Sequence, residues 1–174
     1  MSEAKIQIKN LLFAALAANK SKIKFSKIIK LMSEIKAVEG RLENVGSIKN
    51  NSKVILDYAH TPDALKHTLE SIKEQFSHSS ITIVFGCGGD RDKDKRSIMG
   101  KIANNYCDKI FLTDDNPRYE NPKKIRNQIK KKISRSKLIE IASRGKAIKV
   151  AIENLNSGDI LLVAGKGHEI YQEY

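Results

Sequence analysis

Apolar residues recur at helical spacing in the N-terminal part of the chain. Residues 8–18 and 25–35 each place apolar side chains three and four positions apart, which is typical of amphipathic helices. Asn19 and Lys20 stand near the break between the two segments. This pattern predicts a pair of helices.

After this pair, short β-branched runs alternate with helical patterns. The runs predict strands at 54–57, 81–85, 109–113, 138–141 and 160–164. The spacing between them predicts helices at 62–76, 96–106, 122–136 and 144–155, the first of which Thr61 or Pro62 is expected to open. This order predicts an α/β fold, a mostly parallel Rossmann-like sheet flanked by helices and preceded by the helical pair.

Polar loops leave the ends of the predicted strands. The loops are 57–63, 86–96, 113–120 and 165–169. In open parallel sheets, ligands bind beyond the carboxyl ends of the strands. We therefore expect these loops to converge on one rim of the sheet.

Two of these loops carry charges that suit an amino acid. Arg118 offers a planar fork of donors for a carboxylate. Asp115 and Glu169 offer acceptors for an ammonium group. Together they predict a pocket for a small zwitterion.

The glycine-rich loop 86–96 does not complete a known binding motif. A dinucleotide fingerprint requires glycine where Arg91 stands, and a calcium loop requires Gly and Glu where Lys95 and Lys101 stand. No Gly-Lys pair is followed by Ser or Thr, as a P-loop requires. What remains is a backbone that approaches a ligand beside Arg91, a second cation for a carboxylate. Alternatively, the glycines form a tight turn and Arg91 joins a local ion pair.

Asp57 and His60 place a carboxylate and an imidazole just before a predicted helix. A nucleotide or phosphate group is one ligand for such a position. The alternative is that His60 is a surface or capping residue.

Composition indicates a globular protein without a membrane segment or a metal site. The chain has 174 residues, 40% apolar and 6% aromatic, which suffices for an ordinary core. No apolar run approaches the roughly 20 residues of a membrane span, and the N-terminus lacks the features of a signal peptide, so we expect a cytoplasmic protein. Cys87 and Cys107 lack metal-binding spacing and are expected to be free thiols.

A net charge of +12 raises the question of nucleic-acid binding. The segment 123–137 concentrates basic residues, but Ile125, Ile129 and Ile133 recur within it at every fourth position. The basic residues are therefore interpreted as the solvated side of an amphipathic helix. No aromatic side chains interleave with them for base stacking, and we expect no nucleic-acid partner.

Five segments, taken in order, resemble the Mur ligase family. They are 40–43, 57–65, 84–93, 115–118 and 165–169, and the resemblance covers nearly the whole chain. In this family one domain holds a UDP sugar, a central domain carries the ATPase loop and a C-terminal domain brings the amino acid. The resemblance implies that residues 1–42 are the end of the central domain. Residues 43–174 resemble the C-terminal amino-acid-binding domain, truncated at its own C-terminus.

The resemblance implies ATP-dependent amide formation, in which a peptide carboxylate is phosphorylated and then attacked by an amine. The Asp-Asn-Pro-Arg sequence at 115–118 resembles that of members that add meso-diaminopimelate to UDP-N-acetylmuramoyl-L-alanyl-D-glutamate in peptidoglycan synthesis. ATP and Mg²⁺ are the implied cofactors, with the Mg²⁺ ligands expected mainly on the missing domain. Because the P-loop and the UDP-sugar domain are absent from this sequence, the isolated chain is expected to be inactive.

By resemblance, two groups of residues would bind substrate. The end of diaminopimelate away from the reacting amine carries a carboxylate and an ammonium group. That carboxylate would contact Arg91, Asn116 and Arg118. That ammonium group would contact Asp115, Gly165 and Glu169. The nucleotide side would be formed by Arg41, Asp57 and His60, with His60 also a candidate general base. A second hypothesis stays open: a stand-alone binding module for a diamino acid or a nucleotide, without catalysis.

Overall fold

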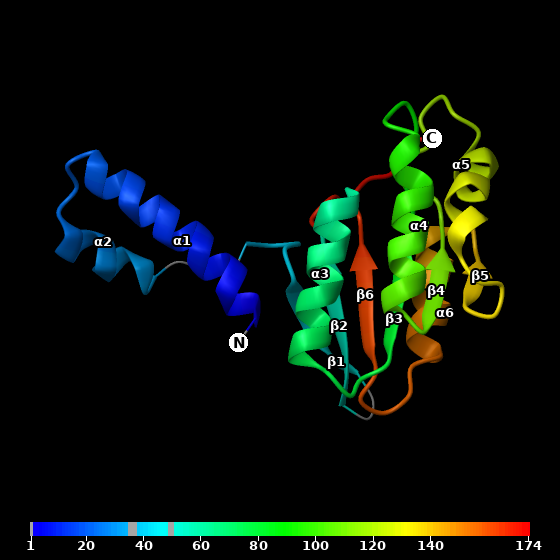
Figure 1. Cartoon of the computed structure of the whole chain (residues 1–174), viewed down its shortest axis with the longest axis horizontal. Helices are drawn as coiled ribbons and strands as arrows, with labels where there is room; N and C mark the ends of the chain where they lie inside the picture. Colours follow the sequence, from blue (N-terminus) through cyan, green and yellow to red (C-terminus); the bar gives the residue numbers. More distant parts are fainter. Residues whose placement is uncertain (1, 35–37, 49–50) are drawn as a thin grey trace. The chain divides into compact units, whose positions relative to one another are not determined.

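The computed structural model describes residues 2–34, 38–48 and 51–174 (Figure 1). Contacts between residues divide the chain into two compact units, Met1–Val38 and Glu39–Tyr174. The first unit is helical and the second is an α/β unit. The division between them falls slightly before the domain boundary predicted at residue 42.

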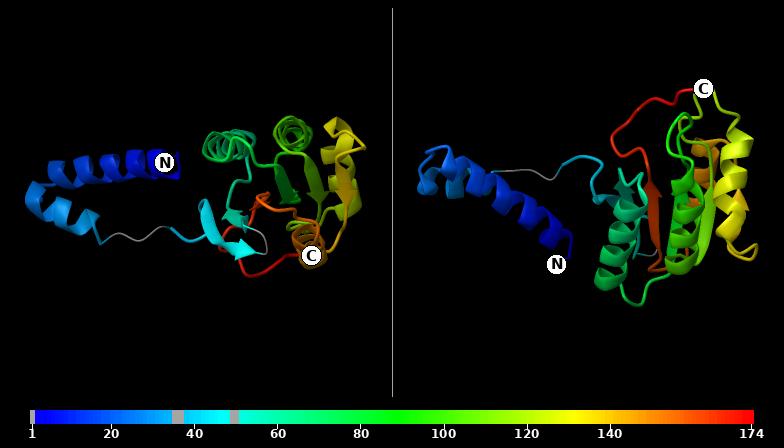
Figure 2. Two further views of the ribbon diagram at one scale, coloured as in Figure 1. Left: turned by 90° about the horizontal axis from the view of Figure 1, so that it is seen from below. Right: turned by 45° about the horizontal axis from the view of Figure 1, so that its top comes forward.

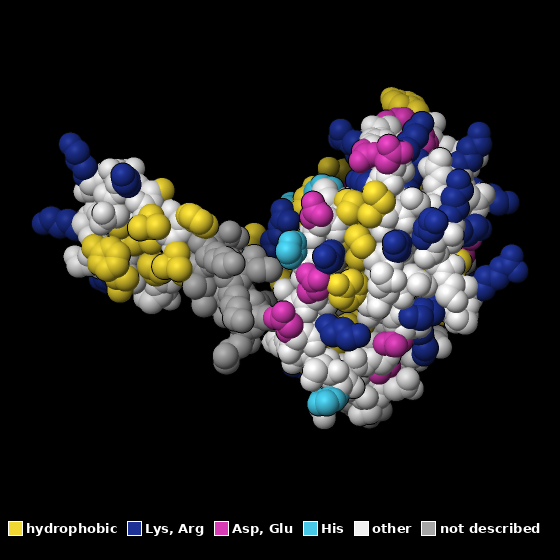
Figure 3. All heavy atoms as spheres, viewed as in Figure 1, with side chains coloured by type: hydrophobic (Ala, Val, Ile, Leu, Met, Phe, Trp, Pro, Cys, Tyr) yellow, Lys and Arg dark blue, Asp and Glu magenta, His cyan; other side chains and the backbone are white. Residues whose placement is uncertain are grey.

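The helical unit contains the predicted helix pair. Helix α1 (Ser2–Lys20) begins earlier than predicted, and α2 (Phe25–Met32) ends before the predicted end at Ile35, which lies outside the described residues. Apolar side chains are exposed on this unit, where Figure 3 shows yellow atoms. The large exposed apolar residues include Leu12, Phe13, Leu16, Phe25 and Ile29. Such a surface is typical of helices that pack against another part of a protein.

The α/β unit is built on a mostly parallel sheet, which confirms the predicted fold class. Its strands are β1 (Glu43–Ile48), β2 (Ser52–Asp57), β3 (Ile81–Phe85), β4 (Lys109–Leu112), β5 (Leu138–Glu140) and β6 (Ile160–Ala164). Within the described residues the order is β1-β2-β6-β3-β4-β5, and only β1 runs antiparallel to its neighbour. The sequence analysis missed β1 because this edge strand is largely exposed and contains Gly46, so it shows no apolar run.

Helices cover both faces of the sheet. Helices α3 (Pro62–Gln75), α4 (Asp94–Tyr106) and α5 (Pro122–Ile129) lie on one face, and α6 (Arg144–Glu153) lies on the other (Figure 2). Alternate residues of β3 serve the two sides, since Ile83 and Phe85 pack with α3, α4 and α5 whereas Val84 packs with α6. Thr61 caps α3 as predicted, its side chain accepting a hydrogen bond from the Ala64 amide at 3.3 Å.

The helix predicted at 122–136 is too long. Helix α5 ends at Ile129, and only a short 3-10 helix, η2 (Lys130–Lys132), follows. The chain is held against the end of α4 instead: Ser134 N donates to Asn104 Oδ1 at 2.9 Å, and Lys137 Nζ donates to Asn104 O at 2.9 Å. These tertiary contacts turn the chain toward β5. The apolar positions of the pattern are nevertheless buried as predicted, including Ile133.

The strand order brings the polar loops to one edge. Strand β6 lies between β2 and β3 and is reached through α6, which crosses the face opposite to the other helices. Strands β2, β6, β3 and β4 are parallel, so the loops that follow them leave the sheet on the same side (Figure 1). In doubly wound folds, ligands bind at the carboxyl edge of the sheet, at the point where the order of the strands reverses.

Cys87 and Cys107 are free and buried, and burial raises the pKa of the Cys87 thiol to about 12. No helix in the described ranges has the length and apolar character needed to cross a membrane. In Figure 3, Lys and Arg side chains are spread over the visible face of the α/β unit, with Asp and Glu among them.

The close packing of α4 on α5 gives a test of the fold. A Cβ atom at Gly100 would clash with the carbonyl oxygen of Ile129, whereas a Cβ at Gly145 in α6 meets nothing within 4 Å. We expect Gly100→Ala to lower the free energy of unfolding by about 1 to 3 kcal/mol, because the helices must move apart. Gly145→Ala should instead raise it by about 0.4 to 1 kcal/mol. Urea denaturation followed by circular dichroism measures both, and equal stability of the two variants would contradict the packing of α4 on α5.

Candidate functional site

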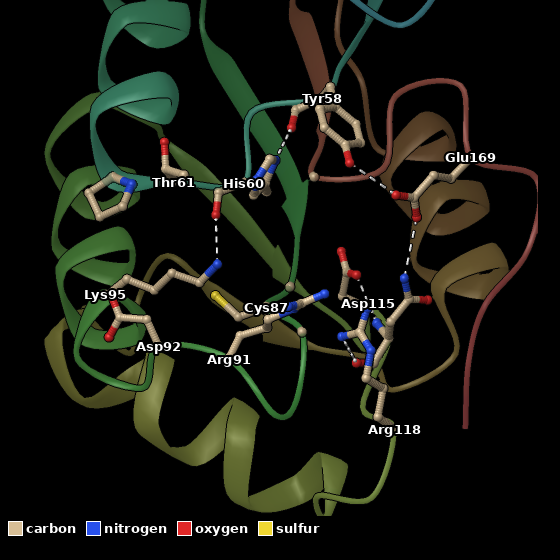
Figure 4. A pocket seen from close by; sticks show the side chains of 15 residues that line it. Tyr58, His60, Thr61, Cys87, Arg91, Asp92, Lys95, Asp115, Arg118 and Glu169 are labelled. Atoms are coloured by element: carbon tan, nitrogen blue, oxygen red, sulfur yellow. Dashed lines mark hydrogen bonds between the residues drawn. The ribbon is translucent and has the colours of Figure 1, made fainter.

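A cavity of about 520 Å³ opens at the carboxyl edge of the sheet (Figure 4). The loops after β2, β3, β4 and β6 all contribute to its lining. Seven of the predicted site residues line it: His60, Arg91, Asp115, Asn116, Arg118, Gly165 and Glu169. Arg41 and Asp57 are not among the lining residues. The structure thus brings together all six residues predicted to bind the amino acid.

The Arg118 guanidinium is held in place on two sides. Its Nη1 donates to Gly89 O at 3.0 Å and to Asn116 O at 3.3 Å, and its Nε lies 2.8 Å from Glu173 Oε2. Within the described residues Nη2 has no hydrogen-bond partner. The Nη2 group therefore remains available to a carboxylate in the cavity.

Arg91 lies on the loop after β3 and is exposed. It lines the cavity and makes no hydrogen bond or ion pair with any described residue. The alternative that Arg91 serves a local ion pair is therefore not supported by its surroundings. Figure 4 shows the Arg91 side chain directed into the cavity, between His60 and Arg118.

Glu169 is surrounded by donors from three segments. Its carboxylate accepts from Lys166 Nζ at 3.1 Å, Asn116 Nδ2 at 3.3 Å and Tyr58 Oη at 3.3 Å. Burial alone raises the pKa of Glu169, but these donors outweigh it and leave the pKa below its ordinary value. The Glu169 carboxylate is thus kept ionised, as an acceptor for an ammonium group must be.

Asp115 is buried beside the last loop. Its Oδ1 accepts from the Asn116 amide at 2.8 Å, and a Cβ at Gly165 would lie 3.0 Å from its Oδ2. Gly165 also has a φ of +108°, a conformation that favours glycine. The absence of a side chain at Gly165 therefore leaves Oδ2 open beside the backbone of this loop.

Asp57 stabilises the fold around the cavity from outside it. Its carboxylate accepts from Leu42 N at 2.7 Å, Ala59 N at 2.9 Å and Thr68 Oγ1 at 3.0 Å. These donors tie together the segment before β1, the end of β2 and helix α3. A direct contact between Asp57 and a nucleotide stays a prediction, and its donors give it a structural role as well.

His60 and Arg41 meet at the aromatic ring of Tyr58. The Arg41 guanidinium lies 4.6 Å from the Tyr58 ring centre, and the His60 ring packs edge-on against it at 4.8 Å. The His168 ring stacks on Tyr58 from the last loop, with ring centres 5.7 Å apart. Aromatic rings and arginine side chains are groups on which nucleobases stack in other proteins.

The sequence analysis missed several buried residues that support the site. Arg96 is fully buried and pairs with Glu120, and Lys166 donates to Asn116 Oδ1 at 2.8 Å. Arg144 donates through Nη2 to Ala164 O at 2.9 Å, and its buried Nη1 has no described partner. Desolvation lowers the pKa of Arg144, against the attraction of Asp115 and Glu169.

A second network, buried at Asp114 and Arg126 and exposed at Glu140, supports the loop after β4. Arg126 pairs with Asp114 and donates through Nε to Glu140 Oε1 at 2.8 Å, and Lys130 donates to Glu140 Oε2 at 2.8 Å. Asp114 directly precedes the cavity residues Asp115 and Asn116, so this network fixes the start of their loop. Among the described residues, no group of three or more His, Cys, Asp or Glu side chains is placed to hold a metal ion.

Comparisons with known proteins agree with this architecture. Residues 40–167 match the model of the Mur ligase glutamate ligase domain. The UDP-N-acetylmuramoyl-L-alanyl-D-glutamate–2,6-diaminopimelate ligase of Rickettsia felis is 48% identical over 167 residues, which cover 95% of this chain and 31% of the relative. The chain thus spans about a third of the length of the curated relatives it matches.

Solved structures show the same likeness. A structure of a UDP-N-acetylmuramoyl-L-alanyl-D-glutamate–2,6-diaminopimelate ligase superposes with a TM-score of 0.71 and 37% identity, over 96% of this chain and 34% of that one. A folylpolyglutamate synthase/dihydrofolate synthase from Yersinia pestis, in complex with AMPPNP and a Mn ion, matches in fold alone. Its TM-score is 0.63 at 17% identity, over 79% of this chain and 31% of that one.

The Arg96–Glu120 pair gives a pH-dependent prediction. Hydrogen bonds from Arg96 are the main cause that lowers the pKa of Glu120 to about 2. Because this pKa lies below the unfolded value of about 4.3, the pair stabilises the fold above that pH and the contribution is lost as the pH falls toward 2. Glu120→Gln should therefore cost about 1.5 to 3 kcal/mol of unfolding free energy at pH 7 and much less near pH 2.5.

Urea denaturation at several pH values measures this difference. The control is Glu153→Gln, because Glu153 is exposed and its one described ion pair, with Lys149, spans 4.0 Å. The control should differ little from the unsubstituted chain at either pH. A cost for Glu120→Gln that stays constant between pH 7 and pH 2.5 would contradict the assigned pair.

Proposed function

Because the chain belongs to the Mur ligase family, whose glutamate ligase domain its residues 40–167 match, we propose that it forms the amino-acid-binding part of an ATP-dependent ligase. The proposed reaction adds meso-diaminopimelate to UDP-N-acetylmuramoyl-L-alanyl-D-glutamate in peptidoglycan synthesis. Relatives that carry this activity in their names match 95% of the chain at 47 to 48% identity. The observation that carries the proposal is that every residue predicted to hold the amino acid lines one cavity.

The charges of the cavity suit meso-diaminopimelate. Its lining holds three cationic side chains, Arg91, Lys95 and Arg118, and three carboxylates, Asp92, Asp115 and Glu169. Meso-diaminopimelate carries two carboxylates and two ammonium groups, so ligand and lining are each balanced in charge. Lysine lacks one carboxylate and would leave a cation of the lining without a partner.

In this proposal, the far end of meso-diaminopimelate lies between the loops after β4 and β6. Its carboxylate accepts hydrogen bonds from Arg118 Nη2, Arg91 and the Asn116 side-chain amide. Its ammonium group donates to Asp115, Glu169 and the backbone at Gly165. Since Arg118 is already oriented by Gly89 O and Glu173, and Glu169 by Lys166, little ordering is needed on binding.

The nucleotide is proposed to lie at the opposite end, near Arg41, Tyr58 and His60. ATP supplies the phosphoryl group that activates the peptide carboxylate, and Mg²⁺ is proposed to be held mainly by residues outside this chain. His60 Nδ1 lies 2.9 Å from Tyr58 O, and since a carbonyl only accepts, Nδ1 carries the proton. The basic nitrogen is then Nε2, which makes His60 a candidate to receive the proton of the attacking amine.

The helical unit supports the view that this chain works with further domains. Residues 1–42 are proposed to end the central ATPase domain. The exposed apolar side chains on α1 and α2, such as Phe13 and Leu16, would then be covered by the rest of that domain. Arg41 lies at the end of this segment, next to the proposed boundary, and is proposed to face the nucleotide.

The proposal is tested by ligation in a chimaera in which this chain replaces the C-terminal third of the Rickettsia felis ligase. The chimaera should release ADP with meso-diaminopimelate and far less with lysine. Arg118→Ala should raise the KM for meso-diaminopimelate by roughly ten- to a hundred-fold, the cost of one charge-assisted contact, and leave residual lysine use nearly unchanged.

The control is Arg135→Ala, because Arg135 is exposed and does not line the cavity. Its kinetics should match those of the unsubstituted chimaera. Equal weakening of both amino acids by Arg118→Ala would refute the assignment of Arg118. A chimaera that folds and prefers lysine would refute the proposed substrate.

A further inference from the structure

The side chain of Arg96 lies beneath the cavity without lining it. It belongs to the first turn of α4 and has no exposed surface, although arginine is among the residues least often buried completely. Removing such a charge from water is costly unless its hydrogen bonds replace the lost hydration. The contacts of Arg96 therefore indicate what its burial achieves.

Those contacts join two separate loops and a helix. Arg96 Nη1 and Nη2 form a bidentate pair with the Glu120 carboxylate, at 3.0 Å to Oε2 and 2.9 Å to Oε1. Nη2 also donates to Gly88 O at 3.0 Å, and Nη1 donates to Gln128 Oε1 at 2.6 Å. One guanidinium thus links the loop after β3, the loop after β4 and helix α5.

Further hydrogen bonds connect the same two loops directly. Glu120 Oε1 accepts from Asp90 N at 2.7 Å, and Asp90 Oδ2 accepts from Tyr119 N at 3.2 Å. Gly89 N donates to Asn116 O at 2.8 Å. The two loops therefore form one hydrogen-bonded unit, and Arg96 is its buried member.

The unit holds its backbone in conformations that need support. Asp90 and Arg118 each have a φ of +51°, in the left-handed region that residues other than glycine seldom occupy. A Cβ at Gly89 would clash with the carbonyl oxygen of Pro117, so the two backbones are in direct contact. Moving one loop would therefore move the other.

The two cations proposed to face the substrate carboxylate sit one on each loop. Arg91 directly follows Asp90 after β3, and Arg118 follows β4, so their separation depends on how the loops are joined. We propose that Arg96 is a positioning residue that sets the spacing of Arg91 and Arg118 and thereby the selectivity of the cavity for an amino acid with a second carboxylate. The substrate class in this inference rests on the proposed function, whereas the joining of the loops does not.

Stability alone is a poor explanation for this arrangement. A buried ion pair can often be replaced by apolar side chains without loss of stability, so its presence alone is weak evidence of a stabilising role. A bidentate pair does specify direction and distance, because the guanidinium is planar and its donors are fixed. Arg96→Lys would keep the charge and lose this geometry.

The test compares Arg96→Met, Arg96→Lys and the control Lys101→Met in the chain of 174 residues. Lys101 lies on the same helix, is exposed and does not line the cavity. Amide hydrogen exchange and calorimetric binding of meso-diaminopimelate and of lysine are measured for each. In Arg96→Met, the Gly89 and Asp90 amides should exchange roughly ten-fold faster or more, while those of β3 are unchanged.

Binding of meso-diaminopimelate to Arg96→Met should weaken by about ten- to a hundred-fold, and binding of lysine should change little. Arg96→Lys should give intermediate values, and Lys101→Met should give none of these changes. Unchanged loop exchange and unchanged affinity in folded Arg96→Met would overturn the inference. Equal loss of affinity for both amino acids would also overturn it.

Two further results have defined meanings. If Arg96→Met unfolds the chain, Glu120→Gln carries the same expectations, because it removes the other half of the bidentate pair and keeps its shape. If the unsubstituted chain does not bind meso-diaminopimelate, the proposal that this chain binds the amino acid without further domains is refuted. The exchange rates at Gly89 and Asp90 still decide whether Arg96 joins the loops.

Discussion

The parallel pairing of β6 with both β2 and β3 is the constraint on which the cavity depends. Five residue pairs join β6 to β2 and four join it to β3, and these registers fix where the three strands end relative to one another. The last loop is thereby placed between the loops after β2 and β3. This insertion brings Glu169 and Asp115 to the lining of the same cavity.

The charged groups of the cavity are held before any ligand arrives. Lys166 and Tyr58 direct the Glu169 carboxylate, while Gly89 O and Glu173 direct the Arg118 guanidinium. Fixed dipoles and charges of this kind bind a matching ligand with little reorganisation. A flexible surface with the same residues would lose much of that advantage, which explains why so many buried polar contacts surround one small cavity.

Much of this arrangement was predictable from the sequence. Buried β6 is a continuous apolar run, β3 is one interrupted only by Thr82, and Thr61 with Pro62 marks the start of α3. The rule that loops gather at the carboxyl edge then predicted that Arg118 and Glu169 would lie near each other, although they are far apart in the chain. These features follow from local patterns and one rule of topology.

The features that were missed depend on tertiary contacts. Strand β1 is an exposed edge strand without an apolar run, and α5 ends at Ile129, after which the chain forms hydrogen bonds with Asn104. Arg96 and Lys166 are buried, but in a chain with 32 Lys and Arg residues nothing local separates them from surface charges. The structural role of Asp57, which accepts hydrogen bonds from three groups of the fold, was also not foreseen, while its contact with a nucleotide stays a prediction.

The most direct test of the account is a crystal structure of the chain with meso-diaminopimelate. We expect one carboxylate of the ligand within hydrogen-bonding distance of Arg118 and the ammonium group at the same end between Asp115 and Glu169. The other amine should point toward His60. A ligand bound in the reverse orientation, with its ammonium group at Arg118, would contradict the account, as would a crystal at saturating ligand with the cavity empty.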